Sequence, residues 1–313
     1  MAKGSSGHHY HFLSWLTGEY VEGYVPEIDR AIMFLPKAIF LTSRRSARLL
    51  LGQKRRDKIK FLQRFWLADY ESPSYHLLRL YHRKNRNKLI KVRVPKYGYS
   101  YLCRINSGDY TPSRELEVLQ KFTPSSGDVV VDVGAHIGRY TIVSSKAVGP
   151  MGRVVAIEAD PDNFKILNYN IELNELTNVL PLNYAAYSED TRLRLYKVTS
   201  SEIYNTVMSS RAHSKNAYVD VDACTLNKIL HLIGISRVDW IKIDVEGAEF
   251  EVIKGATQIM ANNPGLSILI EVHNIDDDPQ HYDRIKNFLE SFGFCVKFEL
   301  AYSSGERHVI FHR

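Results

Sequence analysis

Three valines at 129–131 lead into the stretch Asp-Val-Gly-Ala-His-Ile-Gly at 132–138, and this feature constrains the fold most. An apolar run of this kind predicts a buried strand, and the glycines after it predict a tight turn into a helix. Such a strand–turn–helix unit presents backbone N–H groups and the positive end of a helix to a ligand. The stretch therefore predicts an α/β fold with a ligand site at the end of this strand.

A second apolar run, residues 154–157, ends in Glu158, 20 residues after Gly138. An acid at such a strand end accepts hydrogen bonds from ribose hydroxyls in nucleotide-binding folds. The glycine spacing, Gly134-x-x-x-Gly138, differs from the G-x-G-x-x-G pattern of nicotinamide-binding folds, which makes a nicotinamide cofactor the weaker alternative. The glycines could also serve only to tighten the turn. We expect one nucleotide-like cofactor held across two neighbouring strand ends.

Residues 109–313 alternate between strand-like and helix-like patterns, which is typical of an α/β domain with a parallel sheet. A period-two run at 193–197 predicts an inserted antiparallel strand, and the Ser/Asn-rich segment 199–217 predicts a loop over the site. The other expected strands are 128–133, 153–158, 179–184, 218–221, 239–243, 266–272, 294–300 and 308–312. Helices are expected at 138–148, 226–233 and 280–292. Two more are expected to begin at Pro112 and at Asp160. A further helix should start within 244–249 and carry Val252 to Ile259.

The charge of the chain is divided between two parts. Residues 1–108 hold 21 Lys and Arg against 7 Asp and Glu, a balance of +14, so residues 109–313 have a balance of −8 for an overall net charge of +6. Such asymmetry predicts parts with different partners. We therefore expect a basic, mainly helical N-terminal region at 1–108, with a β-hairpin near 91–105, and a separate α/β domain at 109–313.

The segment 44–64 is the most basic part of the chain, with nine Lys or Arg among its 21 residues and apolar residues between them. Packing against the acidic domain is the simplest interpretation of this pattern. Contact with an anionic membrane surface is the alternative, because interleaved basic and apolar residues suit an interfacial helix. Nucleic acid would use the same charges, but no binding motif accompanies them, so this partner is disfavoured.

Cysteine usage and the N-terminus bear on the compartment. The three cysteines, Cys103, Cys224 and Cys295, are widely spaced, which predicts a reducing environment and excludes a paired-cysteine metal knuckle. Residues 4–9 are rich in Gly, Ser and His, so no signal peptide is expected. The apolar stretch at 31–41 is too short to cross a bilayer. We expect a cytoplasmic protein, with peripheral membrane contact through 44–64 as an option.

The ends of the expected strands concentrate polar residues. In a doubly wound sheet the ligand site lies outside the carboxyl ends of the strands. Four segments that are distant in sequence therefore converge on one crevice. Their polar residues are Asp132, Glu158, Asp244, Glu246, Glu271 and His273.

Four stretches of this chain resemble the FkbM family of S-adenosylmethionine-dependent methyltransferases. They are Asp132-Val-Gly-Ala-x-x-Gly138, Glu158 with Pro161 close behind, Asn183-x-Ala185, and Lys242-Ile-Asp-Val-Glu-Gly-Ala-Glu249, the most specific of the four. The resemblance covers roughly residues 90–300 and makes 109–313 a methyltransferase domain. It implies a class I, Rossmann-like fold, a seven-stranded and mostly parallel sheet with a C-terminal antiparallel hairpin. The chain departs from the family pattern at 158–161, where Glu-Ala-Asp-Pro replaces the usual Glu-Pro.

The resemblance also implies a cofactor site for S-adenosylmethionine. The methionine part would lie over the turn from Gly134 to Gly138, where a carboxylate meets a helix N-terminus. Asp132 would face the cofactor's amino group, Glu158 its ribose, and Ala185 its adenine ring. The cofactor-binding candidates are Asp132, Gly134, Ala135, Gly138, Glu158, Ala159, Asn183 and Ala185.

The family mostly methylates hydroxyl groups of sugars, lipids and polyketides. A hydroxyl is a poor nucleophile until its proton leaves, so a base or a metal is needed beside it. The candidates for catalysis are Lys242, Asp244, Glu246 and His273. Simpler roles stay open for three of them, since Asp244 and Glu246 could cap the next helix and Lys242 could form a structural ion pair with Asp244. The sequence assigns no metal, although Asp244, Glu271 and His273 are suitable ligand types for a divalent ion.

The expected function is therefore O-methylation of a sugar, glycolipid or related metabolite. Two alternatives from other classes stay open at this point. One is a nicotinamide-dependent oxidoreductase, and the other is a non-catalytic membrane- or RNA-binding protein with a relict cofactor pocket.

Overall fold

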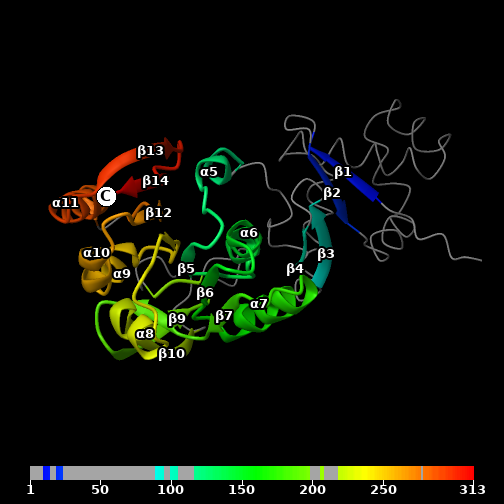
Figure 1. Cartoon of the computed structure of the whole chain (residues 1–313), viewed down its shortest axis with the longest axis horizontal. Helices are drawn as coiled ribbons and strands as arrows, with labels where there is room; N and C mark the ends of the chain where they lie inside the picture. The colour runs from blue at the N-terminus through cyan, green and yellow to red at the C-terminus, as the bar shows by residue number, and fades with distance from the viewer. Residues whose placement is uncertain are drawn as a thin grey trace, which may run out of the picture.

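The computed structural model describes residues 10–14, 19–23, 89–94, 99–104, 116–197, 205–207, 218–275 and 278–313. Its centre is a seven-stranded sheet (Figure 1). The strands are β5 (Val129–Val133), β6 (Arg153–Ile157), β7 (Val179–Leu182), β11 (Trp240–Ile243), β12 (Ser267–Val272), β13 (Cys295–Ala301) and β14 (Arg307–His312). They are ordered β13-β14-β12-β11-β5-β6-β7. Strands β12, β11, β5, β6 and β7 run parallel, and β14 is antiparallel to both neighbours. The predicted sheet and its C-terminal hairpin are confirmed.

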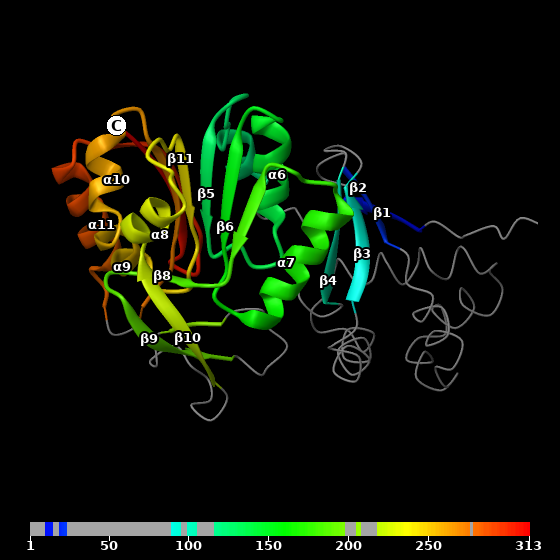
Figure 2. The same cartoon turned by 60° about the horizontal axis from the view of Figure 1, so that its bottom comes forward.

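Helices cover both faces of this sheet (Figure 2). They are α5 (Leu116–Lys121), α6 (Arg139–Val148), α7 (Pro161–Leu173), α8 (Leu226–Leu232), α9 (Glu249–Lys254), α10 (Thr257–Asn262) and α11 (His281–Ser291). On one face, Val131 and Val133 of β5 pack with residues of α8 to α11. On the other face, Val130 packs with residues of α5 and α6. Because side chains alternate along a strand, Asp132 also lies on the α6 face.

A smaller sheet follows β7 in the chain. It consists of β8 (Ala185–Tyr187), β9 (Thr191–Tyr196) and β10 (Tyr218–Thr225), ordered β8-β10-β9. Strands β9 and β10 pair antiparallel, which confirms the inserted strand expected near 193–197. Strand β10 continues four residues beyond the expected end at Val221, because its last residues pair with β8.

The single helix expected after residue 249 is two short helices, α9 and α10, separated at Gly255. Asn227 interrupts the helical hydrogen bonds. Its backbone N–H donates to the Gly255 carbonyl at 2.9 Å, and its Oδ1 accepts from the Ile259 N–H at 3.2 Å. The bond that would join Gly255 to Ile259 in a continuous helix is thereby replaced by two bonds to a residue of α8.

The part of residues 1–108 that the structure describes is a four-stranded antiparallel sheet. Its strands are β1 (Tyr10–Ser14), β2 (Glu19–Gly23), β3 (Leu89–Val94) and β4 (Tyr99–Arg104), ordered as numbered. The hairpin expected near 91–105 is confirmed, whereas β1 and β2 were not predicted. The expected helices of this region, the basic segment 44–64, the helix start at Pro112 and the boundary at 108 lie outside the described residues. No helix in the described ranges is both long and apolar enough to span a bilayer.

Gly255 offers a test of the contact between α9 and β8. A Cβ at this position would lie 2.0 Å from the Tyr187 carbonyl oxygen, whereas a Cβ at Gly265 would meet nothing within 4 Å. We expect Gly255→Ala to lower the free energy of unfolding by about 1–3 kcal/mol through overpacking. Gly265→Ala is the control and should stay within about 0.5 kcal/mol of the wild type. Urea denaturation of the two variants would contradict the close approach if their midpoints coincided.

Candidate active site

Lys242 joins the ends of β5 and β11. The register sets Lys242 opposite Asp132, and only 4% of Lys242 is exposed. Its Nζ lies 3.2 Å from Asp244 Oδ2 and 3.6 Å from Asp132 Oδ1, and it donates to the Gly134 carbonyl at 3.1 Å. Burial alone would lower the pKa of Lys242, but the carboxylates of Asp244 and Asp132 outweigh it and raise the pKa. Lys242 is therefore a fixed positive charge, as in the ion-pair interpretation, and it is a poor proton acceptor.

Asp132 lies fully buried behind the glycine turn. Its Oδ2 accepts a hydrogen bond from Thr141 Oγ1 of α6 at 2.6 Å, and its Oδ1 makes no hydrogen bond within the protein. Burial raises the pKa of Asp132, and the nearby Lys242 ammonium opposes that rise. Thr141 was not among the residues singled out from sequence. A contact of Asp132 with a cofactor amino group stays a prediction.

The glycine turn needs its glycines for two different reasons. Gly134 has φ +74°, and a Cβ there would lie 1.8 Å from the carbonyl oxygen of Asp244. The turn and the end of β11 are thus in direct backbone contact. Gly138, with φ +96°, is the N-cap of α6, and a Cβ there would lie 2.7 Å from Leu167 Cδ1. No side chain caps α6 and its first turn holds no acid, so this helix end can accept a ligand carboxylate.

Glu158 lies buried at the end of β6 and accepts two backbone hydrogen bonds. The His136 N–H donates to Oε2 at 2.7 Å, and the Asp160 N–H donates to Oε1 at 2.8 Å. Burial raises the pKa of Glu158 to about 7, although both hydrogen bonds oppose the rise. Each carboxylate oxygen retains a lone pair, which suits acceptance from two hydroxyl groups.

The displaced proline behind Glu158 has a structural explanation. Asp160 is the N-cap of α7, its Oδ1 accepting from the N–H groups of Asp162 and Asn163 at 2.6 and 3.1 Å. Pro161 takes the first helical position, where its missing N–H costs nothing. The extra residues between Glu158 and Pro161 therefore form the cap of α7.

The remaining cofactor candidates flank Glu158. Asn183 Nδ2 donates to the carbonyls of Glu158 and Ala159 at 2.7 and 3.1 Å, which fixes the backbone after β6. Ala185, buried in β8, and Ala159 belong to one apolar cluster with residues of β9 and β10. Ala159 directly follows Glu158 in the chain, so this cluster borders the end of β6. Asn183, Ala159 and Ala185 are thus brought together with Glu158, and their contacts with a cofactor stay predictions.

His273 lies among four carboxylates just beyond β12. Its Nδ1 lies 2.7 Å from Glu249 Oε1, and its Nε2 lies 3.2 Å from Glu246 Oε2 and 4.0 Å from Asp244 Oδ1. Glu271 Oε1 lies 3.9 Å from the same Nε2. Burial alone would lower the pKa of His273, but Glu246 and Glu249 outweigh it and raise the pKa to about 10. The imidazole is then protonated at neutral pH, so a role as base requires that its proton leave first.

Glu249 and His281 hold His273 in place, and neither was among the predicted site residues. Glu249 is fully buried, and its Oε2 lies 2.8 Å from His281 Nε2. Its Oε1 accepts from the Gly247 N–H at 2.8 Å. Burial would raise the pKa of Glu249, but His273 and these hydrogen bonds hold it well below its usual range. Glu249 falls inside the specific stretch at 242–249, whereas no sequence pattern marks His281.

The capping alternative for Asp244 and Glu246 is wrong. The N-cap of α9 is Ala248, and no side chain caps that helix. Asp244 instead pairs with Lys242, and Lys242 and His273 lower the pKa of Asp244 against the effect of burial. Glu246 has a left-handed backbone conformation with φ +56°, and its carbonyl accepts from Thr206 Oγ1 at 2.7 Å. Both side chains therefore lie beside His273 instead of capping a helix end.

Residues 205–207 are the described part of the loop expected at 199–217. Asn205 Nδ2 donates to Asp160 Oδ2 at 2.6 Å, and Thr206 Oγ1 donates to the Glu246 carbonyl. This short segment therefore links the end of β6 to the end of β11. The sequence predicted the loop but not these two anchoring contacts.

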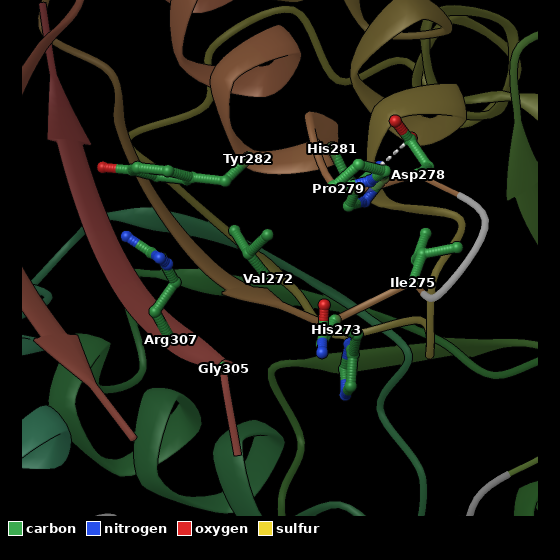
Figure 3. A pocket seen from close by; sticks show the side chains of 10 residues that line it. Val272, His273, Ile275, Asp278, Pro279, His281, Tyr282, Gly305 and Arg307 are labelled. Atoms are coloured by element: carbon green, nitrogen blue, oxygen red, sulfur yellow. Dashed lines mark ion pairs between the residues drawn. The ribbon is translucent and has the colours of Figure 1, made fainter. Parts of the chain in front are cut away.

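A small cavity borders His273 on its α11 side (Figure 3). Its volume is about 60 Å³, and His281, Asp278, Tyr282 and Arg307 contribute to its wall. This space suits a few water molecules and is far too small for a nucleotide. Figure 3 shows that Tyr282 and Arg307 lie on the same side of it.

The strand order and the reversed C-terminal hairpin define the class I, Rossmann-like methyltransferase fold, with a ligand site at the carboxyl edge of its sheet. The family model described as the methyltransferase FkbM domain matches residues 132–296. The chain belongs to the FkbM methyltransferase family. It is therefore an S-adenosylmethionine-dependent methyltransferase, which sets aside the nicotinamide alternative.

Curated relatives of this chain carry methyltransferase names. "Methyltransferase 1" of Beauveria bassiana is 26% identical over 195 residues, which cover 54% of this chain and 73% of that protein. "Hexuronic acid methyltransferase AglP" of Haloferax volcanii is 27% identical over 149 residues, covering 47% of this chain and 56% of that protein. The chain thus spans just over half the length of the second relative. Among solved structures, Aeropyrum pernix fibrillarin with bound S-adenosyl-L-methionine is 14% identical with a TM-score of 0.42, covering 71% of this chain and 93% of that chain.

The residues at this edge of the sheet fit S-adenosylmethionine. Gly134 has no side chain, so the turn packs directly on the backbone of Asp244 and is held at the end of β5. The uncapped α6 N-terminus suits the carboxylate of the cofactor's methionine part. Glu158 has acceptor capacity left for the ribose hydroxyls, and Asp132 Oδ1 is an acceptor without a hydrogen-bond donor.

The raised pKa of Glu158 leads to a prediction for cofactor binding. Only the ionised carboxylate accepts two hydroxyl groups without donating, so binding should favour the deprotonated form. Affinity for S-adenosylmethionine should be constant above pH about 8 and fall by up to about tenfold per pH unit below 7. Calorimetry across this range measures the effect, with Glu158→Gln as the control that should lack the dependence. A wild-type affinity that stays flat down to pH about 5.5 would contradict the role of Glu158.

Proposed function

We propose that this protein transfers a methyl group from S-adenosylmethionine to a hydroxyl of a sugar, a glycolipid or a related metabolite. The observation that carries the proposal is the position of Asp244. Its backbone contacts the glycine turn at Gly134, and its carboxylate faces His273 and Glu246. The glycine turn, where we place the cofactor, is therefore adjacent to the acid cluster, by which we mean Asp244, Glu246 and Glu271 around His273. A transfer between two bound molecules requires such proximity.

The chemistry of the transfer defines what the acid cluster has to do. The cofactor supplies a methyl group on a positively charged sulfur, and transfer breaks the carbon–sulfur bond, leaves its electrons on sulfur and joins the methyl carbon to the acceptor oxygen. The hydroxyl proton must leave to a carboxylate or to water. Asp244 stays ionised because Lys242 and His273 lower its pKa, so it accepts the hydroxyl's hydrogen bond and orients the oxygen.

A sugar hydroxyl suits this cluster as an acceptor. Asp244, Glu246 and Glu271 are partly exposed carboxylates around one buried imidazole, with side-chain exposures of 28%, 12% and 22%. Carboxylates accept strong hydrogen bonds from hydroxyl donors. The name of the relative AglP, a hexuronic acid methyltransferase, supports a sugar derivative as the acceptor. Glycans and glycolipids are therefore the first acceptors to test.

Asp244→Asn tests the proposed chemistry. We expect turnover to fall by about 10²- to 10⁴-fold, because the neutral amide orients the hydroxyl and receives its proton poorly. The dissociation constant for S-adenosylmethionine should change by less than about threefold, since the Asp244 carboxylate contacts Lys242 and lies beside His273. Methyl transfer to a panel of sugars, uronic acids and glycolipids gives turnover, and calorimetry gives affinity.

The matched control is Asp222→Asn, which changes an exposed carboxylate of β10 that pairs with Arg192. This variant should keep wild-type turnover. Equal losses of turnover and of cofactor affinity in Asp244→Asn would make Asp244 a cofactor-binding or structural residue. O-methylation itself would be contradicted if the enzyme methylated amines and modified no hydroxyl compound in the panel.

A further inference from the structure

We propose that Asp244, Glu246 and His273 bind one divalent cation of the Mn²⁺ type. One ligand atom from each of these side chains lies within 4.8 Å of the other two. His273 Nε2 is 3.2 Å from Glu246 Oε2 and 4.0 Å from Asp244 Oδ1. Two atoms that share an ion at about 2.1 Å lie about 3 Å apart in adjacent positions and about 4.2 Å apart in opposite ones. The observed separations therefore need only small side-chain shifts.

The backbone brings these three residues together at one place. Asp244 and Glu246 follow β11, and His273 follows β12, which pairs parallel with β11. Asp244 Oδ2 is held by Lys242, so Oδ1 is the oxygen that faces His273. The ligand atoms thus come from two adjacent strand ends of a rigid sheet.

The orientation of the His273 ring is fixed by a residue that is not one of the three proposed ligands. Its Nδ1 lies 2.7 Å from Glu249 Oε1, on the side of the ring opposite the acid cluster. Glu249 is fixed in turn by His281 Nε2 at 2.8 Å and by the Gly247 N–H. Histidines that bind metals nearly always direct their other ring nitrogen to a carboxylate or a carbonyl group of this kind. Glu249 is therefore a positioning residue that turns His273 Nε2 toward Asp244 and Glu246.

The charges around Nε2 also favour a cation. Asp244, Glu246 and Glu271 all reach within 4.0 Å of this nitrogen. Lys242 neutralises only part of their charge, because it also faces Asp132, and the proton on His273 offsets only one carboxylate more. Coordination through Nε2 would replace that proton with the ion. Glu271 Oε2 lies 3.2 Å from His308 Nε2, which holds this acid beside the site without making it one of the three ligands. A divalent ion would offset the remaining negative charge.

The donor set selects the class of ion. It holds carboxylate oxygens and one imidazole nitrogen, with no sulfur, which suits Mn²⁺ or Mg²⁺ more than ions that prefer thiolates. Its chemical role rests on the proposed function. A cation at this point would bind the acceptor hydroxyl and stabilise its oxygen once the proton has passed to water.

The direct test is a titration of the full-length protein with MnCl₂, followed by electron paramagnetic resonance of free Mn²⁺. We expect one saturable site per chain. Glu246→Gln should weaken binding at least about tenfold, and Glu249→Gln should weaken it about 10- to 100-fold although its carboxylate touches no ion. The control Asp222→Asn should bind as the wild type does. Absence of a saturable site, or wild-type affinity in Glu246→Gln, would overturn the proposal.

Two further measurements keep the result interpretable. Circular dichroism and thermal unfolding report whether each variant folds, and Glu246→Gln is the decisive one because Glu246 is partly exposed. If Glu249→Gln does not fold, the wild-type titration and Glu246→Gln decide alone. Competition by Mg²⁺ against bound Mn²⁺ then tests whether both ions use the same site, whereas Zn²⁺ binds most nitrogen and oxygen sites more tightly than Mn²⁺ and does not test the ion class.

Failure of this proposal is distinguishable from failure of the proposed function. Methyl transfer that proceeds equally with and without EDTA, in a protein that binds no Mn²⁺, would remove the metal and leave the transferase activity. Mn²⁺ binding that is lost in Glu246→Gln would support the site even if no hydroxyl acceptor were methylated. Mn²⁺-dependent turnover that EDTA abolishes and Mn²⁺ restores would support both.

Discussion

One buried positive charge, the ammonium group of Lys242, organises the candidate active site. It lies between the carboxylates of Asp132 and Asp244 and donates to the carbonyl of Gly134. Two acids at adjacent strand ends would repel each other, and a buried ammonium without partners would be costly. Each charge is therefore tolerable only because the others are present. The same contacts tie the glycine turn to the end of β11, so this turn is directly connected to the carboxylates around His273.

Two sides of the crevice differ in their electrostatics. On the β6 side, burial raises the pKa of Glu158 to about 7, and the hydrogen bonds from two backbone N–H groups offset this rise only in part. On the β12 side, His273 and Glu249 shift each other's pKa in opposite directions and both stay charged. Asn205 and Thr206 connect the two sides through Asp160 and the Glu246 carbonyl. The positions proposed for the ribose and for the acceptor hydroxyl thus differ in their electrostatic environment.

Much of the fold could be predicted from local patterns. The valine run before Asp132 and the glycines after it specify a buried strand and a turn, because those conformations depend on neighbours in the chain. The break between α9 and α10 could not be predicted, since Asn227 causes it and lies 28 residues before Gly255. The site was predicted in part. The acids at the strand ends were identified by their position. The contact of Glu249 with His273, and that of His281 with Glu249, were not predicted.

The sequence by itself determined which residues stand at the carboxyl edge of the sheet. Parallel strands end on the same side, so the strand-final residues Asp132, Glu158, Asp244 and His273 had to meet there whatever the details of packing. Only the tertiary structure decided what each side chain does at that edge. His281 reaches Glu249 because α11 packs against α9, and Asp132 lies opposite Lys242 because β5 and β11 pair in one register. Such contacts join residues far apart in the chain, and no local pattern encodes the distance between them.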